Sequence, residues 1–189
     1  LSDVCAMKGS PIQALVSLGI PNKYSVELIE EIYSGIRLAC TNYSIDLIGG
    51  DTTASPTELI INVTIIGEGN PKKTTYRSGA KPNDLLVVSG DLGAAYLGLQ
   101  ILEREKSIFQ ENQKAQPILN KYPYILERQL KPEARVDIIN ALNDLKIQPS
   151  SMIDISDGLS SDVAHLCRAS NVGVKIFENK IPIATETQI

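Results

Sequence analysis

The sequence predicts an α/β (α+β) fold that is divided between two domains. Three observations support this prediction. The elements before residue 70 follow the order strand, helix, strand, strand, and strands and helices alternate again after residue 84. Between them lies a polar stretch, residues 70–84, that is rich in lysine, proline and glycine. We therefore expect one domain over residues 1–75 and another over residues 76–189.

The first domain is expected to contain three strands and one long helix. Residues 11–21 are apolar and bounded by prolines, which is typical of a buried strand. Ser25 is expected to cap a helix, whose apolar residues recur at helical spacing: Ile29, Ile32, Tyr33, Ile36 and Ala39 with Cys40. Residues 45–51, IDLIGGD, predict a strand that runs into a turn at the glycines, and residues 58–69, ELIINVTIIGEG, predict a β-branched strand.

The second domain is expected to alternate strands with helices. Apolar runs predict strands at residues 85–90, 150–156 and 172–177. Helical patterns predict helices at residues 91–106, 136–145 and 157–170. The stretch between residues 107 and 135 is interpreted as a mixture of helix and loop.

Composition and charge argue against several classes of function. The formal net charge is −4, whereas a nucleic-acid partner needs a basic face. No apolar run reaches membrane-spanning length, so we expect no membrane partner. The cysteines, Cys5, Cys40 and Cys167, form no C-x-x-C pair, which is typical of a reducing compartment and predicts a cytoplasmic location. The one histidine, His165, lies within a predicted helix, which argues against a histidine-based triad or a zinc site.

Residues 47–55, LIGGDTTAS, are the first candidate site. Gly49 and Gly50 remove side chains where another group must come close to the backbone. Asp51 adds a hard anionic oxygen at that place, and the hydroxyl residues that follow add neutral oxygens. These groups suit a magnesium ion that carries phosphate groups, and they equally suit an ordinary tight turn.

Residues 152–162, MIDISDGLSSD, are the second candidate site. Asp154 and Ser156 lie two residues apart at the end of a predicted strand, so they face the same side. Asp157 follows at the turn into a helix, and either Ser156 or Asp157 is a suitable N-cap. A cap needs only one of these residues, and like charges this close repel unless a cation lies between them or one is protonated. The pattern therefore predicts a metal site, with a capped and solvated acidic turn as the alternative.

Three further residues have an ordinary interpretation as well as a functional one. Asp3 precedes a short apolar run and by itself is typical of a helix cap. Arg77 lies in the basic stretch, where its guanidinium either reaches a phosphate or stays exposed to solvent. Tyr33 lies on the apolar stripe of the predicted helix, so core packing is its default interpretation.

Four segments together resemble the thiamine-monophosphate kinase family: residues 1–21, 47–55, 76–93 and 152–166. They occur in the order of that family, and the resemblance covers essentially the whole chain. The motifs LSD-x-x-AM-x-G and DISDGL distinguish this family from relatives of the same fold, such as aminoimidazole ribonucleotide synthetase.

The resemblance implies a fold, partners and an activity. The implied fold is the two-domain, aminoimidazole ribonucleotide synthetase-like ATP-binding fold, which forms a homodimer through its N-terminal domain. The implied activity is the ATP- and Mg²⁺-dependent phosphorylation of thiamine monophosphate to thiamine diphosphate by direct in-line transfer. Bound metal, rather than a catalytic side chain, would neutralise the negative charge of the two reacting phosphates. The residues implied to bind metal are Asp3, Asp51, Asp154 and Asp157. The residues implied to contact ATP are Tyr33, Gly50, Asp51, Arg77 and Ser156.

Several motifs that the family uses are missing from these 189 residues. In the N-terminal segment of the family these are an aspartate, a Ser-Thr-Asp metal motif and a histidine on the substrate side. In its C-terminal part they are a Gly-Glu-Asp-Tyr-type motif and an aromatic residue, which hold the thiamine moiety. We therefore expect a fragment truncated at both ends, with parts of an N-terminal ATP- and metal-binding domain and of a C-terminal domain. Two alternatives stay open: another ATP-dependent synthetase of the same fold, or, for the fragment, a non-catalytic nucleotide-binding or assembly module.

Overall fold

The computed structural model describes residues 1–188 and divides into two compact units. The first unit comprises residues 1–76 and 139–154, and the second comprises residues 77–138 and 155 onward. The domain limits predicted at 1–75 and 76–189 stay a prediction. Across residues 1–188, no helix has the length and apolar character needed to cross a membrane.

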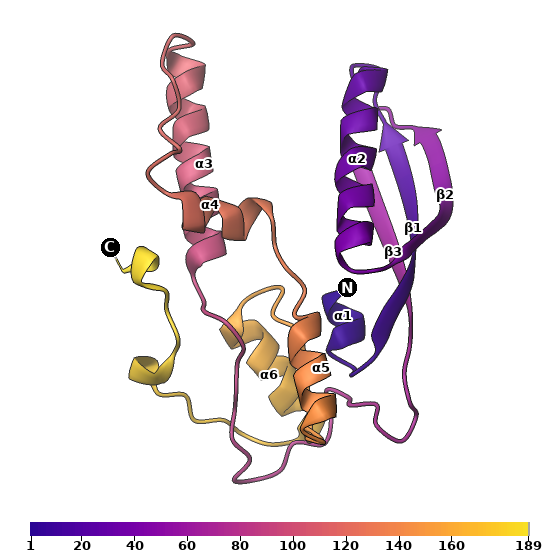
Figure 1. Ribbon diagram of the computed structural model, residues 1–189. Coiled ribbons are helices and arrows are strands. Elements are labelled where there is room, and N and C mark those ends of the chain that lie inside the picture. Colours follow the sequence, from indigo (N-terminus) through magenta and orange to yellow (C-terminus); the bar gives the residue numbers. More distant parts are fainter. Residues whose placement is uncertain (189) are drawn as a thin grey trace. The chain divides into compact units, whose positions relative to one another are not determined.

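A three-stranded sheet forms the centre of the first unit (Figure 1). The middle strand, β1, pairs in parallel with β2 and antiparallel with β3. Alternate residues of β1, namely Ala14, Val16 and Leu18, are almost completely buried. The three strands expected in this part of the chain are confirmed, with the bounds β1 Ser10–Ile20, β2 Asp46–Ala54 and β3 Ile60–Glu68.

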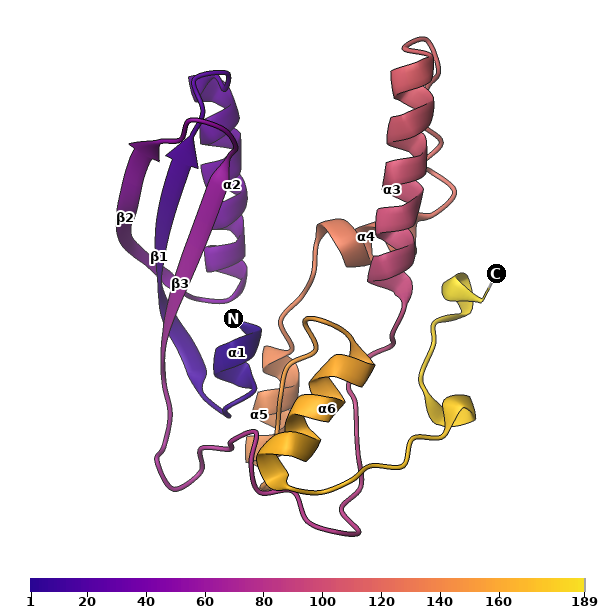
Figure 2. The same ribbon diagram turned by 180° about the vertical axis from the view of Figure 1, so that it is seen from behind.

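Helix α2, Val26–Asn42, lies along one face of this sheet (Figures 1 and 2). The Ser25 hydroxyl accepts a hydrogen bond from the backbone N–H of Leu28 at 3.4 Å, so the predicted cap is confirmed. The predicted apolar stripe includes Tyr33, which is half-buried, but no residue of α2 is fully buried. A four-residue helix, α1 at Ser2–Cys5, precedes β1.

The turn predicted at the two glycines of LIGGD is wrong, because β2 continues through them. Gly50 pairs with Val16 of β1, and a Cβ atom at Gly50 would lie 1.7 Å from the Val16 carbonyl oxygen. The group that comes close to the Gly50 backbone is therefore the neighbouring strand. The glycine indicated correctly that a side chain has no room at position 50, and the reason is the close approach of the paired strand β1.

Four α-helices follow the sheet in the part of the chain that the structure describes, before two short 3-10 helices at Glu178–Lys180 and Thr185–Thr187. The four α-helices are α3 at Ala94–Glu111, α4 at Pro123–Leu130, α5 at Val136–Asp144 and α6 at Leu159–Ser170. In the second unit, α3 packs against α4 around Ile101, Ile125 and Leu126. Gly98 permits this packing, because a Cβ there would lie 2.5 Å from the Ile125 carbonyl oxygen. The predicted helices at 91–106, 136–145 and 157–170 are confirmed with small shifts of their ends.

The three strands predicted after residue 84 are wrong: residues 85–90, 150–156 and 172–177 are irregular. Leu85 and Val87 are 89% and 83% exposed. A strand satisfies its backbone N–H and C=O groups only on a neighbouring strand. In the part of the second unit that the structure describes, strand-like pairing is limited to one isolated bridge between Leu92 and Ile183. The apolar composition was read correctly, but among the described residues no partner strand lies beside these three segments.

Candidate functional site

Asp51 lies in the sheet, in a polar row that crosses all three strands. It pairs with Ser17 of β1, and Ser17 pairs with Asn62 of β3. All three residues are exposed. Ala14 of β1 lines a cavity with residues of α2, so the face of β1 that carries Ala14 is the one towards α2. Successive residues alternate between faces, so Ser17 and its partner Asp51 lie on the face away from α2. The structure therefore does not bring Asp51 and Tyr33 together, since Tyr33 lies on α2.

Asp3 and Asp154 lie in segments that meet in the first unit. Asp3 is exposed in the first turn of α1, and Asp154 is half-buried in an irregular segment. The Ser2 hydroxyl donates a hydrogen bond to Asp154 Oδ2 at 2.9 Å. The backbone N–H of Met152 donates to the Tyr76 carbonyl oxygen at 3.0 Å. These bonds place the LSD motif beside the first residues of the DISDGL motif.

A buried lysine that sequence reasoning missed fastens the same part of the unit. Lys8 is only 8% exposed, and its ammonium donates to the Ile147 carbonyl oxygen at 2.9 Å and to Gln148 Oε1 at 3.2 Å. Gln148 Nε2 donates in turn to Thr75 Oγ1 at 2.8 Å. Residues about 140 apart in sequence are thus joined by side-chain hydrogen bonds. No local signal marks Lys8, because its partners, the Ile147 carbonyl oxygen and the Gln148 amide, lie 139 and 140 residues away in sequence.

The Ser156–Asp157 turn lies in the second unit, and its N-cap differs from the prediction. The residue before α6 is Gly158, and neither Ser156 nor Asp157 supplies a capping side chain. Asp162, in the first turn of α6, accepts the backbone N–H groups of Ser156, Asp157 and Gly158 at 3.1, 3.3 and 3.1 Å. The side chains of Ser156 and Asp157 are exposed. Sequence reasoning missed Asp162, whose only signal is an acidic residue four positions after a glycine.

Arg77 is exposed, and its backbone is tied to the end of α6. The Ser170 hydroxyl donates to the Arg77 carbonyl oxygen at 3.2 Å and accepts the Ala80 N–H at 3.1 Å. Within residues 1–188, no hydrogen bond or ion pair holds the guanidinium of Arg77. The guanidinium is therefore free to meet an anionic ligand.

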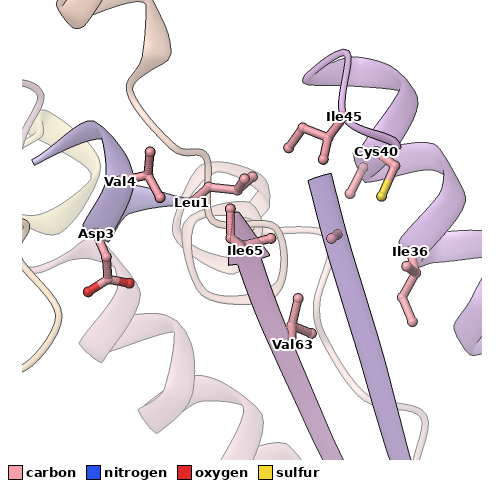
Figure 3. A pocket seen from close by; sticks show the side chains of 10 residues that line it. Leu1, Asp3, Val4, Ile36, Cys40, Ile45, Val63 and Ile65 are labelled. Carbon is pink, nitrogen blue, oxygen red and sulfur yellow. The ribbon is translucent and has the colours of Figure 1, made fainter. Parts of the chain in front are cut away.

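One cavity in the first unit, beside Asp3, has the wrong chemistry for a nucleotide. It measures about 310 Å³ and lies between α1, α2 and the sheet (Figure 3). Its walls are apolar, with Val63 and Ile65 from β3 facing Ile36 and Cys40 from α2. Asp3 supplies the one charged side chain among the lining residues and lies at the margin. The cavity is therefore a gap in core packing beside the candidate site.

The predicted metal ligands do not form a compact cluster in the residues that the structure describes. Asp3, Asp51 and Asp154 belong to the first unit and Asp157 to the second. Over residues 1–188, nowhere do three or more histidine, cysteine, aspartate or glutamate side chains gather closely enough to hold a metal ion. None of the four carboxylates forms an ion pair with a described basic residue. Their chemistry, hard anionic oxygens without a protein cation, fits magnesium, which binds few carboxylates and keeps several waters.

Comparison with known families assigns the fold to a class. The family model for the N-terminal domain of AIR synthase related proteins matches residues 1–68, and the model for their C-terminal domain matches residues 81–188. The chain therefore belongs to the AIR synthase related protein family. The α/β fold class predicted from the sequence is confirmed.

Within this class, the chain is similar to thiamine-monophosphate kinases. It is 34% identical to that of Bacillus subtilis (strain 168) over 186 residues, which cover 98% of this chain and 54% of the relative. It is 34% identical to that of Aquifex aeolicus (strain VF5) over 189 residues, which cover 100% of this chain and 57% of the relative. The chain thus spans about half the length of the curated relatives it matches. The resemblance read from the motifs is confirmed.

Solved structures superpose on this chain as well. AaThiL complexed with AMPPCP and TMP superposes with a TM-score of 0.82 at 33% identity, covering 98% of this chain and 55% of that one. Escherichia coli HypE, a hydrogenase maturation protein, superposes with a TM-score of 0.73 at 17% identity and shares the fold alone.

Proposed function

We propose that the parent protein of this chain transfers the γ-phosphoryl group of ATP to the phosphate of thiamine monophosphate, which yields thiamine diphosphate and ADP. Two comparisons support this proposal. The curated relatives at 34% identity are thiamine-monophosphate kinases. The similar structure of AaThiL contains AMPPCP, an ATP analogue, together with TMP.

The observation that carries the proposal is the hydrogen bond between Ser2 and Asp154. It joins two acidic motifs that lie 152 residues apart in sequence. A solvated acidic turn has no need of a second acidic segment from the other end of the chain. Two such segments side by side, neither paired with a basic residue, are what a cation-assisted phosphate site requires.

The roles proposed for individual residues are those that the family resemblance implies. Asp3, Asp51, Asp154 and Asp157 hold Mg²⁺. When bound, Mg²⁺ neutralises phosphate charge and so lowers the electrostatic barrier between two anionic reactants. The exposed side chains of Arg77 and Ser156 contact the nucleotide phosphates. The family resemblance also assigns Gly50 and Tyr33 to the nucleotide; Gly50 lies against Val16 of the neighbouring strand, and Tyr33 is half-buried on α2.

Transfer is in-line. An oxygen of the acceptor phosphate forms a bond to the γ-phosphorus while the bond from that phosphorus to the bridging oxygen of ADP breaks. A phosphate oxygen is already a nucleophile, so no general base is needed. Catalysis then depends on positioning and on stabilising charge.

The replacement of Asp51 by asparagine in the full-length protein tests this proposal. Asp51→Asn keeps the shape of the side chain and removes its charge, so we expect turnover to fall by about 100-fold or more, as when one charge-stabilising group is lost elsewhere. The measurement is ADP release that depends on added thiamine monophosphate, at saturating Mg²⁺. Asp46→Asn is the matched control, because Asp46 is exposed in the same strand. Turnover of Asp51→Asn equal to that of the control would contradict the role of Asp51.

A second candidate function is a non-catalytic nucleotide-binding or assembly module. The observation that favours it is the lack of a compact acidic cluster in residues 1–188. The two functions differ in one measurement: a module binds nucleotide but releases no ADP when thiamine monophosphate is added. Turnover with a different acceptor would instead indicate another ATP-dependent synthetase of this fold.

The assembly and location of the protein are part of the same proposal. We propose a homodimer formed through the first unit, whose sheet leaves the face opposite α2 exposed. Apolar residues on that face include Ile60 and Ile66, which are 58% and 39% exposed. The cytoplasmic location predicted from the unpaired cysteines stays a prediction.

A further inference from the structure

Asp162 is a buried carboxylate that the proposed mechanism does not use. Its residue is only 3% exposed, and no basic side chain pairs with it among the described residues. One of its oxygens, Oδ2, accepts three hydrogen bonds from consecutive backbone N–H groups, those of residues 156, 157 and 158. Burying a charge costs free energy unless hydrogen bonds compensate for it, so these three bonds explain why the carboxylate is tolerated.

This arrangement fixes the conformation of the turn before α6. Three successive N–H groups can converge on one oxygen only if the backbone between Ser156 and Gly158 curves around it. Gly158 has a φ of 116° and a ψ of 156°, a positive-φ conformation that other residues rarely adopt. With the backbone turned inward to Asp162, the side chains of Ser156 and Asp157 are left exposed to solvent.

The same arrangement restricts how a nucleotide can bind there. The N–H groups before a helix are a common phosphate-binding site, because they are unpaired and lie at the positive end of the helix dipole. Here the N–H groups of residues 156–158 are already occupied by a carboxylate of the same helix. A phosphate that approaches these three residues is therefore met by the side chain of Ser156 and by cations held on Asp157.

We propose that Asp162 is a positioning residue, which holds the turn at residues 156–158 so that Asp157 presents its carboxylate to a divalent cation and Ser156 its hydroxyl to the nucleotide. This inference rests on the proposed function, because it takes Asp157 to be a metal ligand. Asp162 itself is buried behind the turn and contacts neither metal nor nucleotide.

The test separates the geometry of the turn from the charge of Asp162. Asp162→Asn keeps an oxygen that can accept the three N–H groups, whereas Asp162→Ala removes it. Asp162→Glu keeps the charge but moves the carboxylate by one methylene group, and it replaces the alanine variant if that variant does not fold. Ser160→Ala is the matched control, since Ser160 is exposed in the same turn of α6.

The first readout is amide hydrogen exchange at residues 156–158, which needs no ligand. We expect exchange to be at least about tenfold faster in Asp162→Ala and Asp162→Glu, and close to that of the unchanged chain in Asp162→Asn and in the control. The second readout is the affinity for Mn²⁺, titrated in the presence of AMPPCP. We expect it to fall by about 10–100-fold in Asp162→Ala, as when a group that orients a metal ligand is lost, and to be largely retained in Asp162→Asn.

Three results would overturn the inference. Unchanged amide exchange in both Asp162→Ala and Asp162→Glu would show that Asp162 does not hold the turn. Faster exchange with unchanged Mn²⁺ affinity would show that the turn does not serve the cation. An equal loss of Mn²⁺ affinity in Asp162→Asn, with its amides still protected, would assign the effect to charge alone. Asp157→Asn tests the proposed function separately: if it binds Mn²⁺ like the unchanged chain, the metal role of Asp157 fails, and the positioning role fails with it.

Discussion

At the scale of single residues, a capping side chain that precedes its helix was predictable, whereas an acceptor that lies inside the helix was not. Ser25 was predicted as a cap because its partner, the N–H of Leu28, lies three residues away. At α6 the same reasoning chose Ser156 or Asp157, and it was wrong. The acceptor is Asp162, which lies within the helix and reaches back over the turn. A cap pattern read from sequence assumes an acceptor that precedes the helix, so it passes over Asp162.

Cys5 gives a prediction at this scale. Its residue is 5% exposed, and burial raises the pKa of its thiol, so less of it is the reactive thiolate at a given pH. We expect Cys5 to react with iodoacetamide more slowly than the half-buried Cys40 and Cys167 at pH 8. Peptide mass spectrometry after timed labelling measures the three rates. The three should converge in denaturant, and a native Cys5 that is labelled as fast as the others would contradict its burial.

At the scale of secondary structure, helices and strands differ in how well the sequence predicted them. Helices α2, α3, α5 and α6 were predicted because a helix satisfies its backbone hydrogen bonds within one segment. The strands β1, β2 and β3 were predicted as well, and each lies beside another of the three. Residues 85–90, 150–156 and 172–177 have similar apolar patterns but no neighbouring strand among the described residues. Apolar composition therefore shows that a segment suits a sheet, whereas only the pairing makes it a strand.

The side-chain bonds of Lys8 give a prediction at this scale, because they join the segment before β1 to the segment after α5. Lys8→Met keeps most of the side-chain length but removes the donor to Ile147 and Gln148. We expect the free energy of unfolding to fall by about 1–3 kcal/mol, the range for charged hydrogen bonds whose buried partners are left unpaired. Urea denaturation measures it, with Lys72→Met as an exposed control. Equal stability of the two variants would show that the bonds of Lys8 contribute nothing.

At the scale of the whole molecule, contacts between distant segments decide what the motifs can do. The LSD and DISDGL motifs were recognisable one by one, but their meeting depends on the bond from Ser2 to Asp154 across 152 positions. The first unit is itself built from two separate stretches of chain, residues 1–76 and 139–154. No periodicity or spacing in the sequence reports such a return of the chain.

The proposed homodimer is tested at this scale. If the exposed sheet face is the interface, light scattering of the 20.5 kDa chain at micromolar concentration gives about twice that mass. Ile60→Lys places a charge on that face and should shift the mass towards the monomer. Val26→Lys is the control, since Val26 is 71% exposed at the start of α2. A monomeric mass for the unchanged chain would contradict the proposal for this length of chain.

The sequence by itself determined helices α2, α3, α5 and α6, the three strands of the first unit, the acidic motifs and the family. These depend on periodicity, on caps and on residue types, which act over a few positions along the chain. Only the tertiary structure decided that β2 continues through Gly50, that Asp162 holds the turn before α6, and that Ser2 meets Asp154. The physical reason is that Gly50 and Ser2 depend on partners far along the chain, which folding chooses. At α6 several polar residues lie within six positions of the N–H groups, and only the folded backbone selects Asp162 as their acceptor.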